Sequence, residues 1–209
     1  KDPKKAPKIV FVTKGTFYIP VTKNKYGQDQ NYVSIGYPIM IIGAGQEKTI
    51  IHGGFKIQEG TKEKGKEMNM RDMTIKGSRC GLHNNNGLSF SCKSMTFAEC
   101  GWHGLFAKNT KGRLINCVIT QCTWSGIYCY DDALIELEGS QTQVDGNVTS
   151  GNSWEFGLKT CDESSIIHLL FPLTKESVST NNQGGSGNYN SNGTIDTVDS
   201  FDTTMTTTN

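Results

Sequence analysis

The amino-acid sequence predicts an all-β protein, a parallel β-helix (solenoid) with coils of about 22 residues. The main observation is a repeated register, because Trp102 and Trp124 lie 22 residues apart and other side chains recur at the same interval. A period shared by many positions is typical of one structural unit stacked on copies of itself. The recurring sets are Met70, Cys92 and Leu114; Met73, Met95 and Cys117; Ile75, Phe97 and Ile119; and Ser78, Cys100 and Cys122.

Composition and local patterning support the all-β class. The chain has 209 residues, of which 24 are glycine and only 5 are proline. Short alternating apolar runs are broken by Gly, Asn, Asp and Ser, a pattern that predicts short strands joined by tight turns. No long segment has the period of about 3.6 residues that an amphipathic helix requires.

The strands can be placed along the chain in order. The first are expected over residues 9–19 and 38–51, where apolar side chains alternate. Residues 165–173 and 193–198 are expected to form the last coils. Between them lie three aligned units, Met70–Gly87, Cys92–Gly112 and Leu114–Ala133, in which apolar strands are separated by bends. Each unit contains a step in which a glycine is followed by an aliphatic residue. A fourth such step follows an insertion over 139–153. The four steps are Gly81-Leu82, Gly104-Leu105, Gly126-Ile127 and Gly157-Leu158.

A single domain over residues 1–209 is expected, because no linker divides the chain. Residues 9–36 form its first coil or cap region, 37–197 its regular coils, and 198–209 an irregular polar tail. Residues 62–66 are interpreted as a charged loop and residues 181–192 as a loop rich in Gly, Asn and Ser.

Charge, hydropathy and cysteine content exclude some classes of protein. The 21 basic and 20 acidic residues give a net charge of +1, which offers no argument for nucleic acid or an anionic membrane as partner. No apolar run approaches the roughly 20 residues of a membrane span. The seven cysteines are interpreted as mostly free, buried thiols, with Cys100 and Cys122 close enough to stack or bridge.

A polar residue follows each glycine step at the same distance. Asn86, Asn109, Asp131 and Asp162 each lie five residues beyond their glycine. Short polar side chains tolerate left-handed turn conformations, and when stacked at the strand spacing of about 4.8 Å they hydrogen-bond to one another. The sequence therefore predicts a ladder of turn residues that changes from amide to acid at its end.

Several motifs resemble a known superfamily. The segment Ile41-Ile42-Gly43-Ala44-Gly45, followed by Lys48-Thr49-Ile50-Ile51 and Gly53-Gly54, resembles the first coil of pectin-lyase-like right-handed parallel β-helix proteins. The glycine steps with trailing Asn or Asp are similar to the repeat of that superfamily, and the resemblance covers roughly residues 37–197. Residues 112–122 and 165–182 also resemble uncharacterised β-helix proteins from algal genomes.

The resemblance implies a right-handed helix but does not select an activity. The superfamily includes polysaccharide lyases, hydrolases, esterases and epimerases, together with non-catalytic adhesins and virion or wall proteins. Hydrolases of the polygalacturonase type carry four spaced motifs. Here only Asp131-Asp132 and His103-Gly104 are present, in reversed order, which argues against that activity.

An acidic cluster is the first candidate site. Asp131 and Asp162 are expected on equivalent turns roughly 5 Å apart, with Asp132 and Glu163 beside them. Four carboxylates so close together repel unless a proton or a cation intervenes, and their hard oxygens favour calcium. The alternative is a solvated turn whose acids point apart.

An aromatic surface is the second candidate. Trp102 and Trp124 are expected in one outward column, and Phe106 and Tyr128 in another. His83 lies below the second column and Lys159 above it. Outward aromatic rings suit the apolar C–H faces of sugars, so these residues are candidate ligand contacts. The alternative is cross-strand stacking that only shields the sheet.

Two hypotheses about function remain open from the sequence. One is a non-catalytic structural or carbohydrate-binding β-helix of an extracellular or surface assembly, in which other protein subunits could cover the solenoid ends. The other is a calcium-assisted polysaccharide lyase, in which Lys108 or Lys159 acts as base once desolvation lowers its pKa; the alternative for both lysines is simple exposure. Two glycosylation sequons, at Asn147 and Asn192, favour the extracellular setting.

Overall fold

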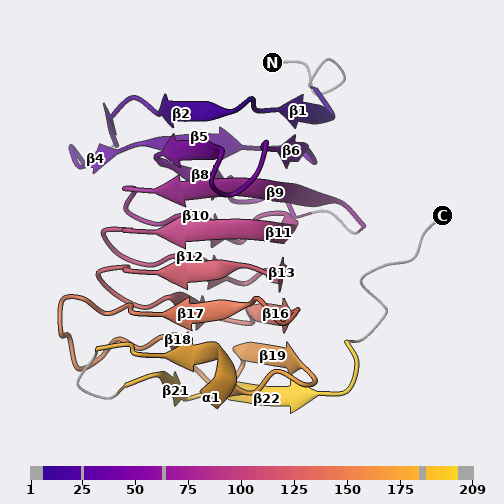
Figure 1. The fold of residues 1–209 in the computed structure, drawn as a ribbon, viewed down its shortest axis with the longest axis vertical. Coiled ribbons are helices and arrows are strands. Elements are labelled where there is room, and N and C mark those ends of the chain that lie inside the picture. Colours follow the sequence, from indigo (N-terminus) through magenta and orange to yellow (C-terminus); the bar gives the residue numbers. More distant parts are fainter. Residues whose placement is uncertain (1–6, 25, 63–64, 184–186, 202–209) are drawn as a thin grey trace.

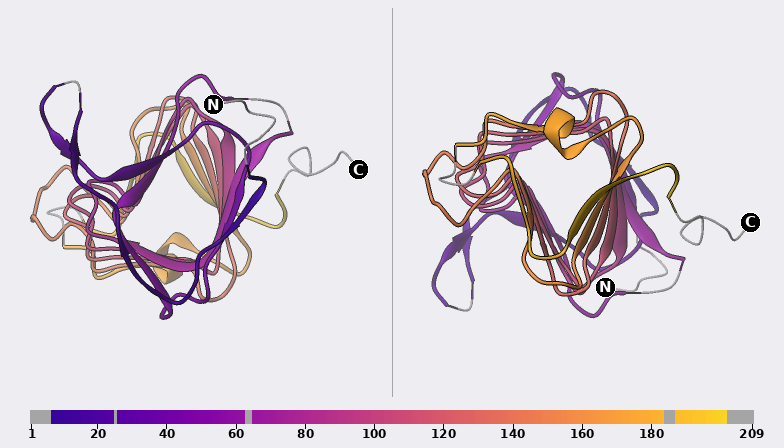
Figure 2. Two further views of the ribbon diagram at one scale, coloured as in Figure 1. Left: turned by 90° about the horizontal axis from the view of Figure 1, so that it is seen from above. Right: turned by 90° about the horizontal axis from the view of Figure 1, so that it is seen from below.

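A computed structural model of the chain describes residues 7–24, 26–62, 65–183 and 187–201. Residues 202–209 of the expected polar tail and residues 63–64 of the expected charged loop lie outside these ranges. Figure 1 shows strands stacked above one another along the long axis of the molecule. Seen from either end, successive strands lie over one another around a common interior (Figure 2).

Nearly all of the strands belong to two parallel sheets. The larger sheet has 13 strands. They form two lines along the stack, and the longest strands belong to both lines. One line contains β1 (Ile9–Phe11), β6 (Met40–Ile42), β9 (Glu67–Lys76), β11 (Ser89–Ala98), β13 (Lys111–Ile115), β16 (Leu134–Glu138), β19 (Ile166–Leu170) and β22 (Thr194–Val198). The other strands of this sheet are β2 (Gly15–Tyr18), β7 (Thr49–His52), β14 (Val118–Thr120), β17 (Gln143–Asp145) and β20 (Ser179–Thr180).

The second sheet carries the candidate site. It has seven parallel strands, β5 (Tyr32–Ile35), β8 (Gly54–Ile57), β10 (Leu82–Asn85), β12 (Leu105–Lys108), β15 (Ile127–Tyr130), β18 (Leu158–Thr160) and β21 (Tyr189–Ser191). A small antiparallel pair, β3 (Thr22–Lys23) and β4 (Asp29–Gln30), projects near the N-terminal end, and a short helix α1 (Lys175–Val178) begins at a capping box formed by Thr174 and Ser177. The all-β prediction is therefore confirmed, and the arrangement is consistent with a parallel β-helix.

The strand pairing follows the sequence repeat in the centre of the chain. Met70 pairs with Cys92, and Cys92 pairs with Leu114, as the repeat predicts. Elsewhere the interval is longer, since Phe55 pairs with Leu82 and Ile127 with Leu158. Loops of different length join the same strand positions, so the repeat of 22 residues describes the central layers and not the whole chain.

Alternation along each strand places one set of side chains in a continuous core. The largest fully buried side chains include Phe90, Phe97, Met68, Met70 and Met73. Six of the seven cysteines are buried and Cys161 is half-buried, and all seven are free thiols, as predicted. Cys100 and Cys122 form no disulfide.

Close stacking leaves no room for a side chain at some glycines. A Cβ atom at Gly112 would lie 2.1 Å from the Phe90 ring, whereas at Gly101 it would meet nothing nearer than 3.8 Å. Because a packed core resists added volume, we expect Gly112→Ala to lower the free energy of unfolding by about 1–3 kcal/mol. Urea denaturation measures this change. The matched substitution Gly101→Ala should stay within about 0.5 kcal/mol of the parent, and equal losses in both variants would contradict the packing described.

Candidate functional site

The outer face of the seven-stranded sheet carries one in-register column of side chains. Its inward neighbours Leu82, Leu105 and Ile127 are fully buried, so the residues that alternate with them point outward. Strand pairing then aligns, layer by layer, Ser34, Lys56, His83, Phe106, Tyr128, Lys159 and Asn190. The predicted order of His83, Phe106, Tyr128 and Lys159 is confirmed, and Lys56 and Ser34 extend the column beyond it.

The rings of this column stack face to face. The His83 and Phe106 centroids are 4.7 Å apart with planes at 8°, and those of Phe106 and Tyr128 are 5.5 Å apart at 12°. Lys159 Nζ lies 5.1 Å from the Tyr128 centroid. The stacked ring faces are therefore occupied by neighbouring rings or by a cation, and a ligand could reach ring edges more readily than faces.

Trp102 and Trp124 form a parallel column at the adjoining turns. Their centroids are 4.5 Å apart and their planes differ by 12°, and the Arg79 guanidinium lies 3.1 Å from the Trp102 centroid. These contacts match the structural alternative of cross-strand stacking. The predicted alignment of the tryptophans is confirmed, and their use as sugar platforms remains a prediction.

His103 lies between the two aromatic columns. It is 3% exposed, and its ring centroid lies 4.6 Å from that of Tyr128 and 5.5 Å from that of Trp124. Its Nδ1 atom has no hydrogen-bond partner among the described residues. Burial, together with the charge of Lys159, lowers the pKa of His103 to about 3. Sequence analysis noted His103 only as part of a motif, because its burial depends on rings from two columns.

Lys159 is held in place by the loop over residues 146–157. Its Nζ atom lies 3.6 Å from Glu155 Oε1 and donates a hydrogen bond to the Trp154 carbonyl. Glu155 is 8% exposed and accepts a hydrogen bond of 2.5 Å from Ser125 Oγ. The Lys159 ammonium is therefore engaged by a carboxylate and a backbone carbonyl, which weakens the case for Lys159 as a general base.

The acidic turn uses its carboxylates for local contacts. Asp162 Oδ2 accepts a hydrogen bond of 2.7 Å from the Asp131 backbone N–H, and Asp162 Oδ1 accepts from both the backbone and hydroxyl of Ser164. Desolvation by itself would raise the pKa of Asp162, but these hydrogen bonds together outweigh it and lower that pKa. Asp131 Oδ2 lies 3.5 Å from Lys108 Nζ, an ion pair between partly exposed groups.

The structure gives no support to a shared cation at the acidic turn. The described ranges contain no group of three or more His, Cys, Asp or Glu side chains placed to hold a metal ion. Asp162 accepts a hydrogen bond from the Asp131 backbone, and Asp131 pairs with Lys108. Calcium binding by Asp131, Asp132, Asp162 and Glu163 therefore stays a prediction.

The turn ladder itself is confirmed at its amide end. Asn109 Nδ2 donates a hydrogen bond of 3.1 Å to Asn86 Oδ1. Asn86, Asn109 and Asp131 have φ values of 55°, 44° and 53°, the left-handed conformation that Asn and Asp tolerate well. The Asp162 carboxylate then continues the ladder by accepting from the backbone of Asp131.

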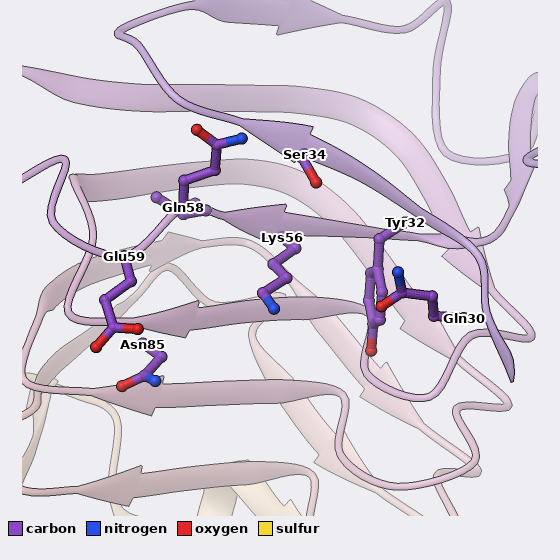
Figure 3. Close-up of a pocket in the computed structure, with 8 residues that line it drawn as sticks. Gln30, Tyr32, Ser34, Lys56, Gln58, Glu59 and Asn85 are labelled. Carbon is purple, nitrogen blue, oxygen red and sulfur yellow. The ribbon is translucent and has the colours of Figure 1, made fainter. Parts of the chain in front are cut away.

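A polar pocket of about 290 Å³ lies beside the N-terminal end of the column, and sequence analysis did not identify it. In Figure 3, Lys56 lies between Gln30 and Tyr32 on one side and Glu59 and Asn85 on the other. Ser34, Ile57 and Gln58 complete the lining. The sequence repeat did not reveal the pocket, because the long loop after β8 separates most of the pocket residues from the aligned units that begin at Met70.

The two sequons differ in accessibility. Asn147 is fully buried, and its Nδ2 donates hydrogen bonds to the Ile119 carbonyl and to Asn182 Oδ1. Asn147 lies in a loop after β17, as expected, but its burial makes its amide inaccessible to glycosylation in the folded protein. Asn192 is exposed.

Comparisons with known proteins add no assignment: no family model matches the chain, and no curated protein or solved structure gives a significant match. None of the described helical segments is long and apolar enough to cross a membrane.

The buried histidines predict a specific pH dependence. Burial lowers the folded-state pKa of His103 to about 3 and that of His83 to about 4, from the ordinary value of 6.5. Below pH 6.5 the unfolded chain therefore binds protons that the folded chain does not. We expect stability to be full above about pH 6.5 and to fall by on the order of 3 kcal/mol for each histidine as the pH approaches 4.

Chemical denaturation between pH 4 and pH 8 measures this loss. The variant His103→Phe keeps an aromatic ring in the cluster but cannot bind a proton, so its stability should depend less steeply on pH. An unchanged slope in this variant would show that His103 is not buried as a neutral ring.

Proposed function

We propose that the protein is a non-catalytic, carbohydrate-binding β-helix of an extracellular or surface assembly, and that the outer face of its seven-stranded sheet is the binding surface. The observation that supports this most is the chemistry of the pocket. Among the described residues, the side chains of Lys56, Glu59, Gln58, Ser34 and Asn85 have neither a hydrogen-bond nor an ion-pair partner.

This set of side chains matches the chemistry of a saccharide. Each sugar hydroxyl both donates and accepts hydrogen bonds, so it can use the amides of Gln58 and Asn85, the Glu59 carboxylate and the Lys56 ammonium. Lys56 can also pair with a sugar carboxylate. A volume of about 290 Å³ is at the lower end for small-ligand sites, which suits one sugar unit of a longer chain.

The column extends the pocket into a linear surface. Lys56 and His83 are in register, and Asn85 is in register with Lys108. Strands lie about 4.8 Å apart, so a polysaccharide along the column would meet a new side chain at each layer. Phe106 and Tyr128, whose stacked faces are covered, would contribute ring edges and rigidity.

We also propose that the sheets are the faces of a right-handed parallel β-helix of the pectin-lyase-like superfamily. The motifs at residues 41–54 support this assignment, as does the interval of 22 residues in the central strand pairs. An extracellular or surface location follows from that assignment and from the exposed sequon at Asn192.

The calcium-assisted lyase has less support. Lys108 and Lys159 each lie beside a carboxylate, and the described residues include no group of three acids placed to hold a metal ion. We expect no rise in ultraviolet absorbance from unsaturated products when the protein is incubated with a panel of uronate polysaccharides, with or without calcium. Product formation that Lys159→Ala abolishes would establish the lyase instead.

A glycan array followed by calorimetry tests the binding proposal. We expect binding to at least one acidic or neutral polysaccharide, and a Kd about 10-fold higher for Lys56→Ala combined with Asn85→Ala, because lost polar contacts cost about 1–3 kcal/mol. Lys93→Ala, which removes an exposed lysine from β11 on the other sheet, is the matched control and should not change the Kd. Absence of binding to every glycan class would overturn the proposal.

A further inference from the structure

Two cysteines occupy the same position in adjacent layers, at the turns that follow β11 and β14. The Gly101 backbone N–H donates a hydrogen bond of 2.7 Å to the Ser78 carbonyl, and the Thr123 N–H donates one of 2.8 Å to the Cys100 carbonyl. These bonds set Ser78, Cys100 and Cys122 in one column. The Ser78 hydroxyl lies 3.9 Å from Cys100 Sγ, so side chains of this column contact the next layer.

The two thiols are enclosed in the core and interact with each other. Both side chains are fully buried and belong to the continuous apolar cluster. Cys100 Sγ donates a hydrogen bond of 3.5 Å to the Ala98 carbonyl, and Cys122 Sγ donates one of 3.6 Å to the Thr120 carbonyl. Hydrogen bonding between the two thiols lowers the pKa of Cys100 and raises the pKa of Cys122.

The register separates the other cysteines from one another. Across the layers, Cys92 lies between Met70 and Leu114, Cys129 between Ala107 and Thr160, Cys117 beside Met95 and Cys161 beside Tyr130. Cys80 is a third thiol near the pair, but the Trp102 N–H donates a hydrogen bond to the Arg79 carbonyl, which sets Cys80 beside Trp102. Cys100 and Cys122 are therefore the two cysteines that the register places face to face.

Their spacing meets the requirement of a disulfide. In-register residues of adjacent parallel strands lie about 4.8 Å apart. The Cα atoms of disulfide-bonded cysteines usually lie about 4.4–6.8 Å apart, so a bond between Cys100 and Cys122 needs no rearrangement of the layers. Residues two layers apart, at about 10 Å, lie beyond this range.

We propose that Cys100 and Cys122 form a disulfide that cross-links two successive layers when the chain folds in an oxidising medium. Both residues are free thiols in the structure, which therefore describes the reduced form. Because both side chains are buried once the layers have closed, the bond forms while the turns stack and is afterwards protected from reductants. The pair faces the interior, so this inference does not rest on the saccharide surface of the outer face, and either proposal can fail alone.

The oxidant is a low-molecular-weight disulfide such as glutathione disulfide. The Cys100 thiolate, which forms more readily than that of Cys122, attacks one sulfur of the oxidant and displaces one glutathione thiolate. The Cys122 thiolate then attacks Cys100 Sγ in the mixed disulfide and displaces the second glutathione. The two protein thiols lose two electrons and two protons in total, and one glutathione disulfide becomes two glutathione thiols.

Refolding of the full chain from its reduced, denatured state tests the proposal. One sample refolds with glutathione disulfide and the other with a reductant, and both are then denatured and alkylated with iodoacetamide. We expect seven alkyl groups by intact mass in the reduced sample and two fewer in the oxidised sample, with one cross-linked peptide that joins Cys100 to Cys122. Because the cross-link closes a loop of about 22 residues, the oxidised sample should melt roughly 5–10 °C higher.

Two variants separate this disulfide from other effects of oxidation. Cys122→Ser should have the same number of alkyl groups and the same Tm in both media. The matched control Cys161→Ser removes a half-buried thiol from another column and should keep the full difference in Tm between the media. Seven alkyl groups in the oxidised parent would overturn the proposal, and this count does not depend on whether any variant folds. A cross-link from Cys80 to either cysteine, or a difference in Tm that persists in Cys122→Ser, would also overturn it.

Discussion

In-register stacking of parallel strands is the interaction on which the rest of the structure depends. Each layer hydrogen-bonds to the layers on either side, so a side chain meets the residues at the same position of its neighbours. Leu105, for example, lies between Leu82 and Ile127 on the inner face of the seven-stranded sheet, while Phe106 lies between His83 and Tyr128 on its outer face. Residues at equivalent positions of successive layers therefore form columns of side chains. Inward columns make up the core, and an outward column makes up the candidate site.

Columns impose a chemical constraint, because like charges cannot stack without cost. The chain meets this constraint by placing opposite charges in adjacent layers. Arg113 and Glu136 are in register, and Arg113 Nη2 lies 2.7 Å from Glu136 Oε2. This ion pair allows Glu136 to be almost fully buried. Lys159 is likewise held by Glu155 from the neighbouring loop. The cations near the aromatic columns therefore have structural partners. Lys56 in the pocket has none among the residues that the structure describes, and this difference distinguishes the proposed site from the scaffold around it.

The repeat allowed strand pairing to be predicted where loops keep their length. The alignments of Met70 with Cys92 and of Phe106 with Tyr128 follow from it directly. The pocket around Lys56 could not be predicted, since the longer connection before β10 removes the repeat there. The repeat also brings the turns of Asp131 and Asp162 next to each other, but the hydrogen bond from the Asp131 backbone to the Asp162 carboxylate could not be predicted, because it depends on the local path of the backbone. Burial of His103 and Asn147 likewise depends on contacts with side chains of the neighbouring layer, Trp124 and Asn182.

Chemical-shift mapping tests most directly the proposal that stacked side chains form a saccharide-binding surface on the seven-stranded sheet. Titration of the isotope-labelled chain with a bound oligosaccharide should perturb the amides of β5, β8 and β10 first, with smaller effects along β12 and β15. Perturbation confined to the turn that contains Asp131 and Asp162, or to the larger sheet, would contradict a binding site on the seven-stranded sheet.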